Sequence, residues 1–409
     1  MQRAKAIQRA TSRLRGLRVR RKIKMGAMTR VQILRHVERK LMEDYSETEI
    51  EAEGAVLKAL GLLPAPLDYK STVLSLLKDQ VAGFYDPKTA TLNLADWIPM
   101  DLQEPALAHE ICHALQDQHF KLKRIIRPLK DNSDQQLAQA ALLEGDCTGV
   151  MLEYMLRSQG IDLGTMPDRM ADLARQSMVG QGGALHKAPL FLRETMFFPY
   201  LHGLELMQEI RSRHPWSRVN LMYKRLPAST EQILHSGKYW RRERPVSVRV
   251  GRRMPALDGY RLIKEDVLGE FQLSLLLRGG VSIDVARRAA AGWGGDRLAA
   301  FRKEGSTAPL LVHLSSWDSD ADALEYVNAL RHTLASRGLT LKSGPPAGTW
   351  IYLDAAGQQW LVQLNGPHIL MLGMVPESIR GALQREVWQS WRVAGRRVTP
   401  TPPVPGSGG

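Results

Sequence analysis

Hydrophobic positions follow two different periods along this chain. In the first half, apolar residues recur every three to four positions, which predicts helices. In the second half, short apolar runs alternate with turn residues and helical stretches, which predicts hairpin strands with flanking helices. The expected fold class is α+β: a mainly helical domain with a small β-hairpin or sheet, followed by an α+β C-terminal domain.

Capping and turn signals set the boundaries in the first half. Ser46 and Glu49 have the spacing of a capping box, and Pro64 ends the helix that begins there. The run 83–94 predicts two strands joined by a turn that contains Pro87. Helices are predicted over residues 31–62 in two stripes, 71–79, from 104 onward, 137–156, 191–211 and 219–225.

The second half has the pattern of a separate unit over residues 255–394. The basic run 241–253 has little periodicity and is interpreted as a linker or a connecting strand, and the run 293–296 as a turn. Helices are predicted over 270–277, 283–290, 320–336 and 376–391. Strands are predicted over 298–302, 309–315, 349–353, 359–364 and 368–374.

One predicted helix carries a metal-binding pattern, His109-Glu110-Ile111-Cys112-His113. Residues four apart share a helix face, so the two imidazoles can bind one Zn²⁺ with Glu110 beside the open coordination position. The alternative is a solvated helix that carries this pattern by chance. A core helix is favoured because apolar residues surround the motif at helical spacing: Leu107, Ile111, Ala114 and Leu115.

A third ligand is expected from the next helix, because a catalytic zinc site has three protein ligands and a water. Glu144 is the candidate, since it interrupts an apolar helical run and a buried carboxylate is costly unless it is paired or binds metal. The alternative is a position that faces solvent. The connecting segment 121–133 is long enough for the second helix to return against the first.

These residues resemble known families. The motif followed by Glu144-Gly145 resembles the gluzincin zinc peptidases, in which such a Glu is a common third ligand. Longer segments resemble a largely uncharacterised family of bacterial metallopeptidases, over residues 60–239 and more weakly 269–329; they are 81–87, 107–120, 144–146 and 229–235. The resemblance implies a zincin-like metallopeptidase domain over 29–245, a Zn²⁺ cofactor, and a peptide or protein substrate.

The expected chemistry assigns a role to each candidate. His109, His113 and Glu144 hold Zn²⁺, and Glu110 is the general base that accepts the proton of the attacking water. A neutral donor should stabilise the oxyanion, with His235 as the first candidate and Tyr154 and Tyr239 next. An isolated His is more often structural. Two carboxylates are candidates to orient the ligand imidazoles, namely Asp117 and Asp146.

The chain has two cysteines, Cys112 and Cys147, each three residues after a proposed ligand. The resembled family usually has other residues at both positions. A disulfide between them would imply an oxidising compartment, and a thiol could compete for metal. Packing as small hydrophobic residues is the default expectation.

Charge is concentrated at the N-terminus. The net charge is +14, and residues 1–24 contribute ten Lys or Arg and no acid, which leaves +4 for the rest of the chain. We expect residues 1–28 to be a flexible basic extension, or a misassigned start ahead of Met25, with peripheral membrane contact through 1–24 as the functional alternative. Neither a signal peptide nor a transmembrane run is present, so a cytoplasmic location is the default, with export if the start is misassigned.

The sequence therefore predicts a zinc metallopeptidase domain over residues 29–245, an accessory α+β domain over 255–394 and a disordered Pro-, Gly- and Ser-rich tail over 395–409. The alternative function is an inactive or regulatory interaction protein on the same scaffold. Specific binding to nucleic acid is not expected, because the body of the chain is only mildly basic and lacks a zinc-finger Cys/His set. The sequence does not decide the oligomeric state.

Overall fold

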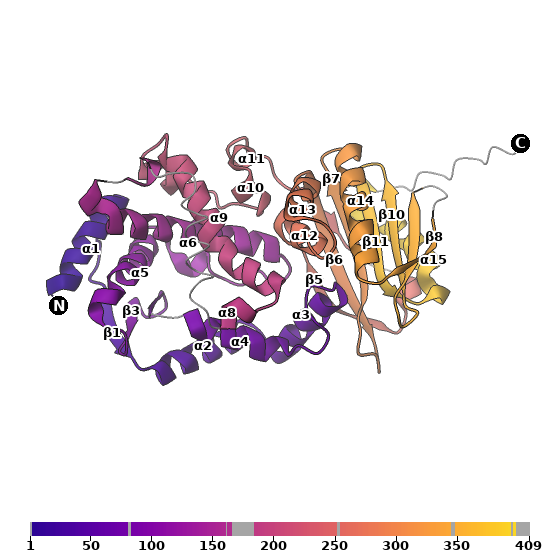
Figure 1. Cartoon of the computed structure of the whole chain (residues 1–409), viewed down its shortest axis with the longest axis horizontal. Coiled ribbons are helices and arrows are strands. Elements are labelled where there is room, and N and C mark those ends of the chain that lie inside the picture. The colour runs from indigo at the N-terminus through magenta and orange to yellow at the C-terminus, as the bar shows by residue number, and fades with distance from the viewer. Residues whose placement is uncertain are drawn as a thin grey trace, which may run out of the picture.

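The chain forms a helical N-terminal unit and an α+β C-terminal unit, which lie side by side along the long axis of the molecule (Figure 1). The computed structural model describes residues 2–80, 83–160, 162–165, 184–251, 254–344, 348–393 and 396–397. The α+β class expected from the sequence is confirmed at this level. The tail expected over 395–409 falls outside the described residues, except for residues 396–397.

The N-terminal unit is built mainly of helices. Its longest helices, α5 (Met100–Phe120), α6 (Ser133–Leu156) and α9 (Leu190–Arg211), pack against one another. Shorter helices surround them: α1 (Gln2–Arg15), α2 (Arg30–Asp44), α3 (Glu47–Ala59), α4 (Tyr69–Gln80), α8 (Ala184–Lys187), α10 (Glu231–Leu234) and α11 (Ser236–Trp240). Single 3₁₀ turns occur at η1 (Leu122–Arg124), η2 (Arg157–Gln159) and η3 (Leu163–Thr165).

Two helix boundaries differ from those expected. Helix α5 begins four residues before residue 104, directly after Pro99, and Pro105 lies inside it. Pro105 is the sixth residue of α5, so it lies beyond the first turn and removes one i→i−4 hydrogen bond of the helix. The helix expected over 219–225 is instead a 3₁₀ helix, η4 (Trp216–Leu221). The capping box at Ser46 and Glu49 is confirmed at the start of α3.

A three-stranded sheet lies beside α5. Strands β2 (Gly83–Asp86) and β3 (Thr91–Ala95) form the expected antiparallel hairpin, and β1 (Lys24–Met28) pairs with β3 in parallel. The strand order is β1-β3-β2, so β2 is at the edge of this sheet.

The expectation of a flexible N-terminal extension is wrong for the described residues. Helix α1 packs against α5 and α6, and its buried residues Ile7, Thr11 and Arg15 recur every four positions along one face. At least three of the ten cations in residues 1–24 form ion pairs with these two helices: Arg3 with Glu104, Arg15 with Asp146, and Arg21 with Asp117. The high charge of this segment suggested a solvated arm, because composition alone does not show that the buried residues recur along one face of the helix.

The C-terminal unit is built on a seven-stranded antiparallel sheet of order β5-β6-β7-β11-β10-β9-β8. Strands β5 and β8 were not expected, and the run 293–296 is the start of β6 rather than a turn, with a bulge near Gly295. The strands are β5 (Tyr260–Asp266), β6 (Trp293–Lys303), β7 (Leu310–Trp317), β8 (Thr340–Ser343), β9 (Thr349–Leu353), β10 (Gln359–Asn365) and β11 (His368–Val375).

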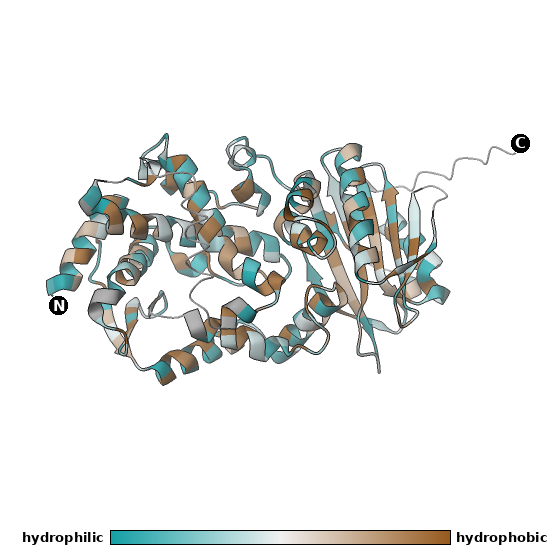
Figure 2. Cartoon of the chain, viewed as in Figure 1, coloured by the Kyte–Doolittle hydropathy of each residue, from teal (hydrophilic) through white to brown (hydrophobic). Residues whose placement is uncertain are grey.

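Helices cover both faces of this sheet. Alternate residues of β6 belong to different cores: Leu298 and Ala300 pack with α12 (Gly269–Leu277), α13 (Ile283–Ala290) and α14 (Asp320–Ser336), whereas Ala299 and Phe301 pack with α15 (Glu377–Ser390). Strands covered on both faces are apolar throughout, and the central strands are accordingly largely brown in Figure 2. Short strands β4 (Val248–Arg249), β12 (Arg392–Val393) and β13 (Arg396–Arg397) form a third sheet.

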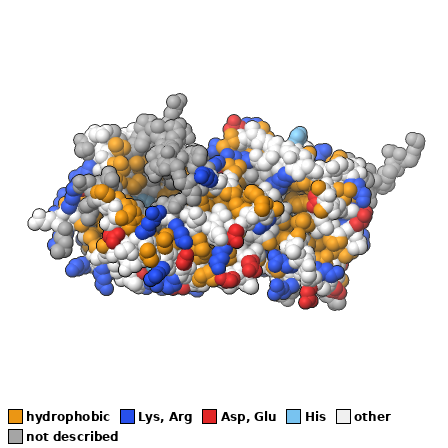
Figure 3. Space-filling view, turned by 60° about the horizontal axis from the view of Figure 1, so that its bottom comes forward, with side chains coloured by type: hydrophobic (Ala, Val, Ile, Leu, Met, Phe, Trp, Pro, Cys, Tyr) orange, Lys and Arg blue, Asp and Glu red, His pale blue; other side chains and the backbone are white. Residues whose placement is uncertain are grey.

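Polar side chains join the two units. Asp266 of β5 accepts a hydrogen bond of 2.7 Å from the backbone N–H of Ser133, at the start of α6. His235 pairs with Glu270 of α12, and Lys238 with Asp318 after β7. On the face drawn in Figure 3, Lys and Arg side chains are scattered over both units with acidic ones among them. None of the helices described in the structure is long and apolar enough to cross a membrane.

Candidate metal centre

Three of the predicted ligands converge between α5 and α6. His109 Nε2 lies 3.1 Å from Glu144 Oε2 and 3.1 Å from His113 Nε2, and His113 Nε2 lies 3.4 Å from the same carboxylate oxygen. One ligand atom from each residue lies within 4.8 Å of the others. The side chains are 13% exposed for each His and 24% for Glu144, so solvent reaches the cluster.

The buried faces of α5 hold the two imidazoles in place. Leu107, Ala108, Ile111 and Cys112 are fully buried on either side of the histidines. Because the core fixes the rotation of α5 about its axis, positions 109 and 113 turn toward α6. The helical spacing in the sequence therefore leads directly to the geometry of the pair.

A glycine contact positions Glu144 and brings a third helix close. A Cβ at Gly145 would lie 2.2 Å from the carbonyl carbon of Gly203, and a Cβ at Gly203 would lie 2.3 Å from the carbonyl oxygen of Ala141. Helices α6 and α9 can approach this closely only because neither position has a side chain. The Gly that follows Glu144 thus has a packing role, which is to seat α9 beside the cluster.

Electrostatics hold the metal-free cluster as an ion pair. Burial would lower the pKa of His113, but the carboxylates of Glu144 and Glu110 outweigh burial and raise it to about 10. Burial would raise the pKa of Glu144, but the imidazoles of His113 and His109 hold it well below its usual range. A cation that binds here must displace the proton of His113.

Gln116, which the sequence analysis did not single out, orients His113. Its Oε1 lies 2.9 Å from His113 Nδ1, and its Nε2 donates to the carbonyl of Leu143 at 3.1 Å. An amide oxygen only accepts, so it keeps the proton on Nδ1 and leaves the Nε2 lone pair of neutral His113 facing the cluster. The signal was present in the sequence, since Gln116 follows His113 by three residues on the helix.

The two carboxylates expected to contact the ligand imidazoles lie one step further out. Asp146 accepts from Gln116 at 3.1 Å, from Tyr223 at 2.6 Å and from buried Arg15 at 2.5 Å, so it anchors Gln116 rather than a His. Asp117 accepts from the hydroxyl of Tyr85 at 2.9 Å. Both therefore support the site indirectly.

Glu110 faces the edge strand β2. Its Oε2 accepts a hydrogen bond of 2.6 Å from the backbone N–H of Tyr85. Burial raises the pKa of Glu110 above its ordinary value, and the imidazoles of His113 and His109 oppose this only in part. A carboxylate with a raised pKa next to a cation site is suited to accept and return a proton.

Tyr200 of α9 is the neutral hydroxyl at the cluster. Its phenol interacts with the carboxylate of Glu144, and its ring centroid lies 6.3 Å from that of His109. The charge of Glu144 and then burial raise the pKa of the Tyr200 phenol well above its usual value, so it keeps its proton. In the sequence Tyr200 is one aromatic residue in an apolar helix, and only the Gly145–Gly203 contact places it here.

His235 lies elsewhere, so its expected catalytic role is not supported. Its Nε2 pairs with Glu270 Oε1 at 2.9 Å, and it is not part of the metal-capable group around His109. The segment 229–235 has a structural role, because Thr230 binds Asp134 while His235 binds the C-terminal unit. Tyr239 donates to the carbonyl of Arg225, and Tyr154 interacts with Glu104, so neither alternative donor is directed to the cluster.

Both cysteines are free thiols in the core between α5 and α6. Cys147 Sγ lies 3.4 Å from His113 Nδ1, and burial raises the pKa of this thiol well above its usual value. A thiol that keeps its proton is a poor metal ligand, because metals bind the thiolate. Packing, the default expectation, agrees with this placement.

A second acidic group, formed by Glu231, Glu243 and Asp318, already contains a cation. Lys238 Nζ lies 2.5, 3.1 and 2.6 Å from their carboxylate oxygens. The ammonium takes the place that a metal would occupy, so this group joins the two units rather than binding an ion.

Comparison with known proteins bears on the C-terminal unit alone. Residues 259–378 match a family described as a domain of unknown function (DUF8575), which covers the sheet from β5 to β11 with α12, α13 and α14. No curated protein and no solved structure matches the chain. The matched range contains Glu270, the partner of His235, and none of the three ligand residues.

Proposed function

We propose that this chain is a zinc-dependent hydrolase, and within that class a zincin-like peptidase that acts on peptide or protein substrates. The observation that carries the proposal is the convergence of His109, His113 and Glu144 with Glu110 beside them. Two imidazoles and one carboxylate, with room for water, form the donor set of catalytic rather than structural zinc sites.

The residues present fit a zinc ion. Their ligand atoms lie close enough together to bind one ion. In the metal-free protein His113 carries a proton on the pair with Glu144, and a metal ion would replace that proton. His109, His113 and Glu144 would hold the ion through Nε2, Nε2 and a carboxylate oxygen. When bound, zinc lowers the pKa of a water ligand and polarises a carbonyl oxygen.

Glu110 is the proton acceptor in this proposal. The N–H of Tyr85 fixes one of its oxygens, which leaves the other free to take a proton from water and pass it to the leaving amine. The same hydrogen bond uses a backbone donor on the open edge of β2, so a substrate that pairs with this edge would have to use the donors and acceptors beyond Tyr85.

Tyr200 replaces His235 as the proposed oxyanion donor. A phenol that keeps its proton over the whole working pH range can donate a hydrogen bond to negative charge as it develops. Removal of one such donor costs on the order of 10²–10³ in kcat. A Tyr200→Phe variant should therefore retain metal and lose turnover by about that factor.

Two measurements test the proposal. Elemental analysis of purified protein should find about one zinc per chain, and His113→Ala and Glu144→Ala should lose it. Glu110→Gln should keep the metal and lose about 10²–10⁴ in turnover of a quenched-fluorescence peptide library. Met155→Ala, at an exposed position near the end of α6, is the matched control for both assays.

The outcomes separate hydrolase from scaffold. Full turnover by Glu110→Gln would reject Glu110 as the base. A chain that binds zinc without cleaving any peptide would instead favour the inactive or regulatory interaction protein.

A further inference from the structure

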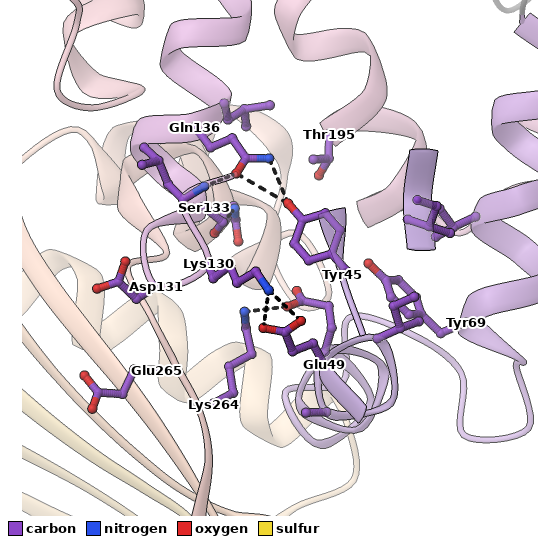
Figure 4. Close-up of a pocket in the computed structure, with 18 of the residues that line it drawn as sticks. Tyr45, Glu49, Tyr69, Lys130, Asp131, Ser133, Gln136, Thr195, Lys264 and Glu265 are labelled. Atoms are coloured by element: carbon purple, nitrogen blue, oxygen red, sulfur yellow. Dashed lines mark hydrogen bonds and ion pairs between the residues drawn. The ribbon is translucent and has the colours of Figure 1, made fainter. Parts of the chain in front are cut away.

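A large pocket opens where the helical unit meets the sheet of the C-terminal unit. Its volume is about 710 Å³, within the range of roughly 300–1,000 Å³ that is typical of ligand sites. Helices α2, α3 and α4 form one wall, and α6, α9 and β5 form the other (Figure 4). The metal ligands are not among the residues that line it.

The pocket nevertheless comes within one helical turn of the metal centre along α6. Gln136 and Ala140 line the pocket, and Glu144 follows on the same face of α6 at the next helical repeat. With a rise of about 1.5 Å per residue, Ala140 precedes Glu144 by only about 6 Å.

Helix α9 carries one residue at each place, although these two residues lie on different faces of the helix. Helices α6 and α9 run in the same direction, because Gly145 meets Gly203 and Gly149 meets Met207. Thr195 lines the pocket, and Tyr200 lies about 7 Å further along α9, beside Glu144. On α6, the pocket residue Ala140 and the proposed ligand Glu144 thus lie one helical turn apart.

The charged groups around the pocket neutralise one another. Lys130 pairs with Glu49 at 2.7 Å, and Lys264 with Glu53 at 2.6 Å. Asp131 and Glu265 both lie near Arg297, at 3.7 and 3.8 Å, and Lys70 pairs with Glu47. A charged ligand group would lose water without finding an unpaired counter-ion, so an uncharged ligand is favoured.

The inner wall is apolar with a few hydroxyl groups. The side chains of Ile50, Leu137, Phe191 and Leu192 form the apolar surface. In Figure 4, the hydroxyls of Tyr69 and Thr195 point toward the same space, and the hydroxyl of Tyr45 is hydrogen-bonded to Gln136 beside it. Thr195 Oγ1 is buried and has no hydrogen-bond partner among the described residues, so a hydroxyl or amide of a ligand would satisfy it.

We propose that this pocket receives large uncharged side chains of the substrate on one side of the scissile bond. This inference rests on the proposed peptidase function. Side chains of the substrate contact the apolar wall, and a polar group of the substrate backbone or side chain forms a hydrogen bond with Thr195. The peptidase would therefore select Leu, Phe or Tyr over Asp or Lys at one substrate position.

The test varies one flanking position at a time in quenched-fluorescence peptides. Wild type should prefer Leu, Phe or Tyr over Asp or Lys by about tenfold or more in kcat/KM at one position. Ala140→Trp should fill the pocket and lower kcat/KM about tenfold or more for peptides with these large residues, with less than about threefold change for Gly or Ala at that position. Met155→Trp adds the same side chain to an exposed position of α6 and should change neither value.

A second variant and a binding assay keep the result decisive. Thr195→Val has nearly the same shape without the hydroxyl, and should weaken binding of the preferred peptide by about three- to tenfold if Thr195 contacts the ligand. Binding is measured by fluorescence anisotropy of labelled peptides on zinc-loaded Glu110→Gln protein, so it does not depend on turnover.

The two proposals can fail separately. Peptides that bind with the expected preference but are never cleaved by wild type would refute the hydrolase and keep the pocket. Cleavage without any preference at flanking positions, or an equal loss for all peptides in Ala140→Trp, would refute the pocket and keep the hydrolase.

Discussion

Replacing Gly145 by Ala tests whether the close contact of α6 and α9 builds the metal centre. The added Cβ would lie 2.2, 2.4 and 2.5 Å from the carbonyl carbon, carbonyl oxygen and Cα of Gly203. Ordinary contact begins near 3.4 Å, so the helices must separate by about 1 Å. All three atoms are backbone, and no flexible side chain can move aside.

The expected loss of stability combines two opposing effects. Overpacking costs about 1–3 kcal/mol, while Ala in place of Gly inside a helix contributes about 0.5–1 kcal/mol. The net free energy of unfolding should fall by about 1–2 kcal/mol, which lowers Tm by roughly 2–8 °C for a unit of this size. Separation also shifts the turn of α6 that carries Glu144 relative to the imidazoles of α5, so zinc affinity should fall by about ten- to hundredfold.

The matched control is Gly381→Ala in α15. A Cβ there would meet only the guanidinium of Arg385, at 3.6 Å, so the helix preference for Ala should raise stability by about 0.5–1 kcal/mol. Thermal unfolding and zinc titration of the two variants decide the matter. If Gly145→Ala is as stable as Gly381→Ala and binds zinc as tightly as wild type, the contact does not shape the site.

Three further predictions address other parts of the chain. In the metal-free protein the pKa of His113 is raised to about 10 from an unfolded value of about 6.5, so its pairing with Glu144 contributes fully below pH 6.5 and is lost as pH rises through 10. The difference in free energy of unfolding between wild type and His113→Ala, measured by chemical denaturation, should shrink over that pH range. Calorimetry of zinc binding in buffers of different ionisation enthalpy should detect the release of about one proton per zinc at pH 7–8. Arg15→Ala should lower the free energy of unfolding by about 3–5 kcal/mol, because it leaves the carboxylate of Asp146 buried without its cation. An unchanged free energy of unfolding would instead favour a flexible N-terminal extension. His235→Ala should lower stability by about 1–3 kcal/mol and leave zinc stoichiometry and turnover intact, whereas a large loss of kcat alone would return His235 to the catalytic set.

The parts of the site that the sequence predicted depend on local spacing. His109, Glu110 and His113 share one helix, and helical geometry alone orients them once the apolar stripe is buried. Glu144 could be predicted for a related reason, since an acid in an apolar helical run needs a partner. Most boundaries of α3, α9, α14 and the central strands also follow from periodicity and capping.

The remaining parts depend on contacts between residues far apart in the chain. The sequence indicates neither that Tyr200 reaches Glu144 nor that Arg15 crosses to Asp146, because each requires a particular packing of two helices. His235 lies away from the cluster, because a family-like segment identifies neighbours in sequence and not in space.

The sequence by itself determined the α+β class, the helical frame and the side chains that could donate to a metal, because these depend on periods of two to four residues and on side-chain chemistry. The tertiary structure decided which groups support those donors, that the basic N-terminus is a packed helix, and that a neutral pocket adjoins the site. The packed N-terminal helix and the support of the donors arise where α1, α5, α6 and α9 meet, whereas the pocket lies between α2, α3 and α4 on one side and α6, α9 and β5 on the other. Helix contacts depend on shape and on small residues such as Gly145 and Gly203, which composition and periodicity do not encode.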